Sequence, residues 1–184
     1  MRLLQVQAAF RHGARTPMEG LGDEPARWDA KAQRTYLSGS ERRTLCAVSM
    51  IHPGEGAAVD PLAHFHTCRT AEPLDGGGLP GMLTRVGLEQ SRALGARLRE
   101  RYVDPQARNS ASVRNGYLLP RAWSSARHLV HPRSTLVERT VFTAAGVLSG
   151  LFPEDAAAGA MEAEVHMNVP KGSNGKEEYM VCNG

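Results

Sequence analysis

The chain has 184 residues, with 22 lysines and arginines against 19 aspartates and glutamates, and 41% of its residues are hydrophobic. This length fits one domain with a substantial core. No stretch reaches the run of about 18 apolar residues that a membrane span needs. A net charge of +3 is too small to indicate a nucleic-acid-binding protein.

The first predicted element is a strand at the N-terminus. Leu4, Val6, Ala8 and Phe10 occupy alternate positions, which is the period of a half-buried strand. The strand ends at Arg11-His12-Gly13-Ala14-Arg15-Thr16-Pro17, where glycine and proline indicate a loop. Ligands of open α/β sheets bind at the carboxyl ends of strands, so this loop is a candidate site.

The next stretch, 18–80, has weak periodicity, several prolines and the run Gly76-Gly77-Gly78. Such a long irregular stretch inside a domain is typical of a functional lid or an insert. We therefore treat 18–80 as a lid-like irregular region.

A helix is predicted from Thr84, whose hydroxyl suits an N-cap, to Tyr102. Leu94, Leu98 and Tyr102 recur at helical spacing, with Leu88 near the same stripe. This stripe is expected to be the buried face of the helix.

The remainder of the chain contains one further helix and one weak strand. The stretch 109–132 is basic, contains no acid and is a possible insertion. A second helix is predicted over 135–149, with Gly150 as its stop, and a weak strand near 164–169. A strand, two helices and a final strand indicate an α/β fold.

The residue types in the first loop suit phosphoryl transfer. The guanidinium groups of Arg11 and Arg15 match phosphate oxygens in pairs. A histidine between them is disfavoured as a cation, and neutral imidazole is a nucleophile. The neighbouring guanidiniums would neutralise the oxyanions that repel an attacking group. The pattern predicts a phosphohistidine intermediate on His12. A basic surface loop is the weaker interpretation, because five matched residues directly follow a predicted strand.

The segment Arg11–Pro17 resembles the Arg-His-Gly-x-Arg-x-Pro signature of the histidine acid phosphatases, a branch of the histidine phosphatase superfamily. Two further blocks are similar to helical regions of that family. They include Gly81-Met82-Leu83-Thr84-Arg85-Val86-Gly87, Arg133-Ser134-Thr135 and Gly150-Leu151-Phe152-Pro153. Within the family, these blocks look most similar to the lysophosphatidic acid phosphatases.

The resemblance implies a mixed, mainly parallel sheet flanked by helices, as in phosphoglycerate mutases, and no cofactor. It implies that His12 is the nucleophile and that Arg11, Arg15 and Arg133 bind the phosphoryl group, whereas Arg139 is a structural or helix-surface residue. The expected substrate is a small phosphomonoester or a lysophospholipid. The expected location is cytoplasmic, since no secretory signal is seen, or mitochondrial by resemblance; the oligomeric state stays open.

The chain departs from the family pattern at the proton donor, which in the family is the acid of a downstream His-Asp or His-Ala-Glu sequence. No histidine of this chain is followed by an acid at one or two positions. General acid catalysis typically contributes about 10²–10⁴-fold. We therefore expect 1–184 to be a single, partial domain, the N-terminal portion of a longer phosphatase. The alternatives are a protein that binds phosphate or phospholipid without turnover, and a fragment that does not fold alone.

We predict no catalytic or metal-binding role for the cysteines, the other histidines or the acids of the irregular region. The cysteines at 46, 68 and 182 are expected to be free thiols, since an odd count in a chain of this size does not indicate a disulfide framework. His64, His66 and Cys68 lack a second pair of ligands, so no metal site is predicted. The acids of the irregular region are interpreted as surface charges; they are Asp23, Glu24, Asp29, Asp60 and Asp75.

Overall fold

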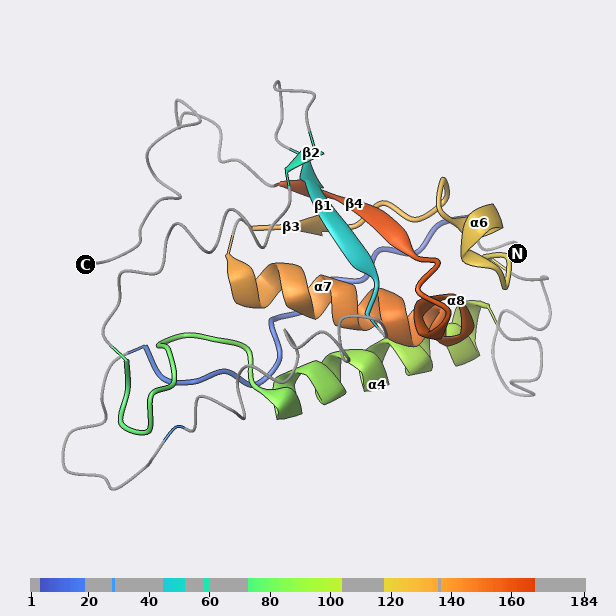
Figure 1. The fold of residues 1–184 in the computed structure, drawn as a ribbon. Helices are drawn as coiled ribbons and strands as arrows, with labels where there is room; N and C mark the ends of the chain where they lie inside the picture. Colours follow the sequence, from blue (N-terminus) through green and yellow to red (C-terminus); the bar gives the residue numbers. More distant parts are fainter. Residues whose placement is uncertain are drawn as a thin grey trace.

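The computed structural model describes residues 4–18, 28, 45–51, 58–59, 73–103, 118–135 and 137–167. Figure 1 shows α7 between a small sheet and α4. None of the described helices is both long enough and apolar enough to cross a membrane. The elements are β1 (Ala47–Ile51), β2 (Ala58–Val59), α4 (Arg85–Tyr102), α6 (Trp123–Ala126), β3 (Arg133–Ser134), α7 (Glu138–Leu151), α8 (Pro153–Ala157) and β4 (Glu162–Met167).

The sheet is mixed and mainly parallel. Its strand order is β2-β1-β4-β3. Strands β1 and β3 both run parallel to β4, and only the β1–β2 pair is antiparallel. Together with the helices packed beneath it, this sheet confirms the predicted α/β class.

Strand β4 forms close to the position that the sequence pattern predicts. Its burial alternates along Glu162–Met167, and Ala163, Val165 and Met167 are the buried positions. Strand β1 lies inside the stretch 18–80, and no strand was predicted there. Only Met50 of its five residues is fully buried, so the sequence has no clear two-residue period.

The helix predicted from Thr84 to Tyr102 is confirmed as α4. The hydroxyl oxygen of Thr84 accepts a hydrogen bond from the Gly87 N–H at 3.1 Å, which is the contact of an N-cap. The helix ends with the Val103 N–H donating to the Arg99 carbonyl oxygen. The N-cap signal at Thr84 therefore predicts the start of this helix correctly.

The buried face of α4 is not the predicted leucine stripe. The buried residues are Gly87, Leu88, Ser91 and Gly95, whereas the leucines and the tyrosine of the stripe, except Leu88, are only half-buried. A face of small residues is buried because α7 packs directly against it (Figure 1).

Helices α4 and α7 meet backbone to backbone through glycines. A Cβ atom on Gly95 would collide with the Val147 carbonyl oxygen, and one on Gly150 would collide with the Arg92 carbonyl oxygen. Gly150 was predicted to stop the second helix, yet α7 begins at Glu138 and continues through it to Leu151. This glycine serves close helix packing rather than termination.

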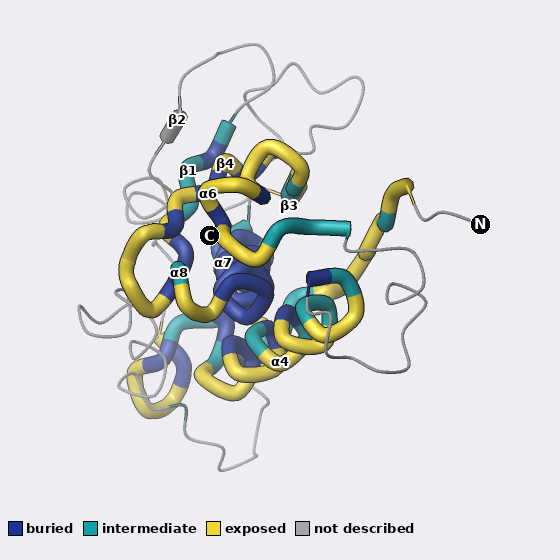
Figure 2. The backbone as a smooth tube through the Cα atoms, turned by 90° about the vertical axis from the view of Figure 1, so that its right-hand side faces the viewer, coloured by how far each residue is buried: buried dark blue, intermediate teal, exposed yellow. Residues whose placement is uncertain are grey.

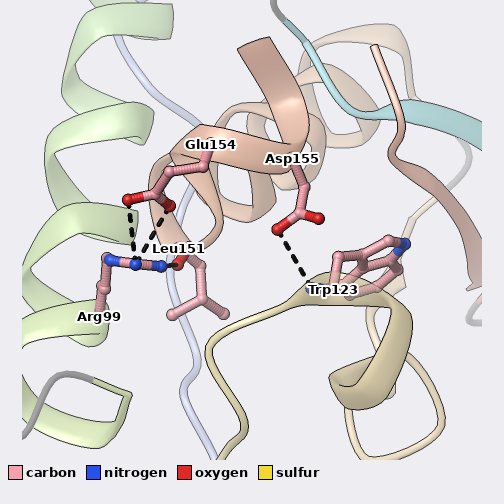
Figure 3. Close-up of polar contacts among 5 residues, drawn as sticks. All are labelled: Arg99, Trp123, Leu151, Glu154 and Asp155. Carbon is pink, nitrogen blue, oxygen red and sulfur yellow. Dashed lines mark hydrogen bonds and ion pairs between the residues drawn. The ribbon is translucent and has the colours of Figure 1, made fainter. Parts of the chain in front are cut away.

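Polar contacts connect the four described helices, α4, α6, α7 and α8, at one end (Figure 3). Arg99 on α4 donates to the Leu151 carbonyl oxygen at the end of α7 (3.0 Å) and pairs with Glu154 of α8 (3.1 Å). Asp155 of α8 accepts a hydrogen bond from the backbone N–H of Trp123, the first residue of α6, at 3.1 Å. These contacts set α8 and α6 relative to the α4–α7 pair.

Two residues in the described part of the possible insertion, 118–132, are buried in the core: Trp123 and Ala126. Trp123 is 5% exposed, and its indole N–H donates to the Glu162 carbonyl oxygen at 3.1 Å. Its ring lies edge-on to that of Phe152, with 5.3 Å between centroids. Residues 109–117 lie outside the part of the chain that the structure describes.

The strand predicted at Leu4–Phe10 does not form. The segment has no regular secondary structure, no strand pair among the described residues includes it, and Leu4 and Phe10 are 78% and 44% exposed. Figure 2 shows it largely exposed at the edge of the molecule. A cavity of about 810 Å³ separates the segment from α4, α7 and Arg133 of β3. An alternating pattern supplies a strand's side chains, but a strand also needs a neighbour to pair with.

Cys46 is buried in the core, 3% exposed, and its N–H donates to the Ser149 hydroxyl at 2.8 Å. Burial, and then the charge of Glu162, raise the pKa of the Cys46 thiol to about 12. The thiolate is the reactive form of cysteine, so the folded protein should protect this residue.

We expect Cys46 to react with iodoacetamide at pH 8 about 10³-fold more slowly in the folded than in the unfolded chain, because a raised pKa leaves little thiolate. The Cys68→Ser, Cys182→Ser variant makes Cys46 the single thiol for this measurement. The folded state holds this proton more tightly, so stability should fall as pH rises above about 8.5. Equal alkylation rates in buffer and in guanidinium would contradict the expectation.

Candidate active site

The segment Arg11–Pro17, called the arginine loop below, lies against α4 and α7. The Gly13 N–H donates to the hydroxyl of Thr143 on α7 at 3.2 Å. The Ala14 carbonyl oxygen accepts both the N–H and the hydroxyl of Thr84, each at 2.9 Å. The loop is therefore held from both helices by hydrogen bonds.

Two glycines allow the arginine loop to touch the first turn of α4. A Cβ on Gly13 would collide with the Gly87 carbonyl oxygen, and a Cβ on Gly87 would collide with the carbonyl oxygen of Ala14. This close approach explains why glycine follows the histidine of the loop.

The second half of the arginine loop pairs with the segment before α4. Thr16 is fully buried. Its N–H donates to the Met82 carbonyl oxygen at 2.9 Å, and its hydroxyl donates to the Leu79 carbonyl oxygen at 2.8 Å. The Met82 N–H donates back to the Thr16 hydroxyl at 2.8 Å. Arg15 and Leu83 form an isolated antiparallel bridge. These bonds leave the backbone around Arg15 little freedom.

The half-buried His12 ring has its orientation set by its own loop. Its Nδ1 lies 2.8 Å from the Gly13 carbonyl oxygen. A carbonyl oxygen only accepts hydrogen bonds, so Nδ1 carries the hydrogen. In the neutral ring, the lone pair is then on Nε2, which is the nitrogen available for attack.

Three arginines are relevant to the charge of the site: Arg11 and Arg15 in the arginine loop, and Arg139 on α7. Arg11 is exposed, whereas Arg15 is half-buried and donates from Nη1 to the Thr16 carbonyl oxygen at 2.7 Å. Arg139 lies in the first turn of α7. Burial, and then the charges of Arg15 and Arg11, hold the pKa of Arg139 below its ordinary value.

Arg133, predicted to complete the phosphate pocket, lies on β3 and is exposed. Its backbone pairs with His166 of β4, and the residue lines the same cavity as Phe10, the neighbour of Arg11. Arg133 therefore lies beside the cavity, whereas Arg139 is the arginine whose pKa is lowered by burial and then by the charges of Arg15 and Arg11. Arg139 was predicted to be a structural or helix-surface residue. Its spacing from Thr143, one helical turn along α7, is the sequence signal that could have placed both residues on one face.

The described residues hold no group of three or more histidines, cysteines, aspartates or glutamates that could bind a metal ion. Among the acids considered as proton donors, Asp75 is described and is exposed. The other acids, metal-capable residues and thiols considered lie outside the described residues; they are Asp23, Glu24, Asp29, Asp60, His64, His66, Cys68 and Cys182.

The sequence of the whole chain gives its family. Residues 2–179 match the model of the histidine phosphatase superfamily, branch 2. The chain therefore belongs to this family, which confirms the resemblance carried by the arginine loop.

Particular relatives match parts of the chain. Lysophosphatidic acid phosphatase type 6 of Mus musculus is 35% identical over 105 residues, which is 56% of this chain and 23% of that protein. The Homo sapiens protein of the same name is 32% identical over 105 residues, with the same coverage of each chain. Counting factor 60 of Dictyostelium discoideum is 31% identical over 155 residues, covering 83% of this chain and 33% of that protein. The matched region thus spans between 23% and 33% of the length of these relatives.

Proposed function

We propose that this protein is a phosphomonoester hydrolase that acts through a phosphohistidine intermediate on His12. The hydrogen bond from His12 Nδ1 to the Gly13 carbonyl oxygen carries the proposal, because it leaves the Nε2 lone pair free for attack. The same loop supplies Arg11 and Arg15, whose charges suit phosphate oxygens. Membership of the histidine phosphatase superfamily supports this chemistry.

The proposed reaction has two displacement steps. In the first, Nε2 of His12 attacks phosphorus, the N–P bond forms, and the ester P–O bond breaks, so the departing oxygen takes up a proton. In the second, water attacks the phosphohistidine, and the N–P bond breaks to release inorganic phosphate. Arg11, Arg15 and Arg133 are proposed to bind the phosphoryl oxygens in both steps.

Lysophosphatidic acid is the proposed substrate. Relatives named for this substrate support the proposal. The cavity whose lining includes Phe10, the chain neighbour of Arg11, supports it too, because apolar side chains such as Leu98, Leu129 and Val130 also line it. An acyl chain would gain free energy by leaving water for such a surface.

Phosphate or phospholipid binding without turnover is the second candidate function. It is favoured by one observation: no histidine in the chain is followed within two residues by an acid. A missing proton donor slows departure of the leaving oxygen and leaves phosphate binding intact.

Labelling with ³²P-lysophosphatidic acid tests the two candidates. The chain is mixed with substrate and quenched in alkali, where phosphohistidine survives. We expect label on the peptide that contains His12, together with phosphate release over many turnovers. Label without sustained release would support phosphate binding by an impaired enzyme. Absence of label during rapid phosphate release would contradict His12 as the nucleophile.

Glycerol 3-phosphate is the matched control for the acyl chain, since it has the same phosphate ester without the lipid tail. Burial of apolar groups contributes about 0.8 kcal/mol per CH₂, so kcat/KM should be at least about tenfold lower for the control. Equal values for the two substrates would contradict the lipid assignment while leaving the phosphohistidine proposal intact.

A further inference from the structure

We propose that the segment between α6 and β3 binds the surface of an anionic membrane, and that this contact brings the neighbouring cavity to its lipid. The segment comprises residues 127–133 and is called the α6–β3 segment below. The inference takes its lipid substrate from the proposed function, but binding to a membrane requires no hydrolysis.

The first argument is where the exposed apolar side chains lie. The large hydrophobic residues that are exposed in the described part of the chain are Leu4, Phe10, Met18, Val86 and Leu129. Leu4, Phe10 and Leu129 line the same cavity of about 810 Å³. Single exposed apolar residues are ordinary on a protein surface, whereas a group of them indicates an interaction surface.

The second argument is the charge around Leu129. The exposed residues that flank it in the α6–β3 segment are Arg127, His128, His131 and Arg133. No aspartate or glutamate occurs from 118 to 135. Arginine stays protonated in proteins, so the segment carries positive charge at any working pH. Cations around exposed apolar side chains suit a membrane whose headgroups are anionic.

The third argument is that the backbone of the α6–β3 segment is held in place. The Leu129 N–H donates to the Ala126 carbonyl oxygen at 2.8 Å, and the Pro132 carbonyl oxygen accepts the His166 N–H at 3.0 Å. Figure 2 shows the chain between α6 and β3 largely exposed. Leu129 is thus presented to solvent by a fixed backbone, and a preorganised surface loses little conformational entropy on binding.

A membrane fits these observations better than a second copy of the chain or a nucleic acid. Two copies that met through this face would bring like charges together around their symmetry axis, which is unfavourable. A nucleic acid offers phosphates but no hydrocarbon layer for Leu4 and Leu129. An anionic bilayer offers phosphates at its surface and hydrocarbon directly below them.

Co-sedimentation of the intact chain with vesicles tests the proposal. We expect the wild type to bind mixed phosphatidylcholine–phosphatidylglycerol vesicles about tenfold or more tightly than phosphatidylcholine alone, and added salt should weaken this binding. Arg127→Glu changes the charge by two units and should weaken binding to the mixed vesicles about 25-fold. Leu129→Ser removes a half-exposed apolar group and should weaken it about tenfold. Arg133 is not varied, because the proposed function assigns it to the phosphoryl group.

Arg85→Glu and Val86→Ser are the matched controls. Both residues are exposed in the first turn of α4, about 20 Å along that helix from Leu98, which lines the cavity. Both variants should bind the mixed vesicles as the wild type does. An equal loss in the controls and in the two α6–β3 variants would overturn this segment as the membrane-binding surface.

Three further outcomes would overturn the proposal. They are a wild type that does not bind the mixed vesicles, wild-type binding by folded Arg127→Glu and Leu129→Ser, and binding of a single-stranded oligonucleotide without binding of vesicles. Circular dichroism checks folding, and if Leu129→Ser does not fold, the exposed Arg127 decides through Arg127→Glu. Label on His12 without vesicle binding would refute the membrane contact and leave the proposed function standing.

Discussion

Replacing His12 by alanine is expected to lower the rate of phosphate release from an aryl phosphate by on the order of 10³-fold or more, because the variant lacks the proposed nucleophile. Alanine also removes the ring that lies against the Gly13 carbonyl oxygen, while the backbone bond from Gly13 to Thr143 remains. Phosphate binding should therefore survive in His12→Ala, and catalysis should not. Steady-state kinetics and calorimetry with inorganic phosphate measure the two effects separately.

His128→Ala is the matched control, since this histidine is exposed next to α6 and the structure gives it no role in the site. Its rate should equal that of the wild type. An unchanged rate in His12→Ala would falsify the phosphohistidine mechanism. A wild-type chain that takes up label once and then stops would instead show that the nucleophile works and that the second step or the proton donor fails.

The largest expected effect on stability comes from Gly95→Val. A Cβ at this position would collide with the Val147 carbonyl oxygen and crowd the Leu151 nitrogen, so α4 and α7 would have to separate. Overpacking usually costs about 1–3 kcal/mol, and a clash with backbone allows less relaxation than one with side chains. We expect a loss of about 3 kcal/mol or more in the free energy of unfolding, measured in urea.

Ala96→Val provides the control, because Ala96 is the exposed neighbour of Gly95 on the same helix. It introduces the same β-branched side chain at a cost of less than about 1 kcal/mol, which reflects helix propensity alone. Equal destabilisation by the two variants would show that α4 and α7 do not meet through this glycine. Separation of the helices should also weaken phosphate binding, since Thr84 at the start of α4 holds the arginine loop.

Several parts of the fold follow from signals that are local in the sequence. The N-cap Thr84 and the helix that it begins are predicted correctly because capping needs only residues three or four positions apart. Strand β4 is found because its alternating burial spans six residues. Strand β1 is missed because only Met50 of its five residues is fully buried, which leaves no alternating pattern to find.

The sequence by itself predicted the chemistry that we propose for the arginine loop, since His12 and the cations Arg11 and Arg15 lie within five consecutive residues. Only the tertiary structure decided what surrounds that loop. It buries Arg139 where the charges of Arg15 and Arg11 act on it. It also buries the small residues of α4 together with Leu88, while Leu94 and Leu98 stay half-buried. No strand pair among the described residues includes Leu4–Phe10. The physical reason is that each of these outcomes depends on contacts between segments far apart in the chain, which no local pattern of residues encodes.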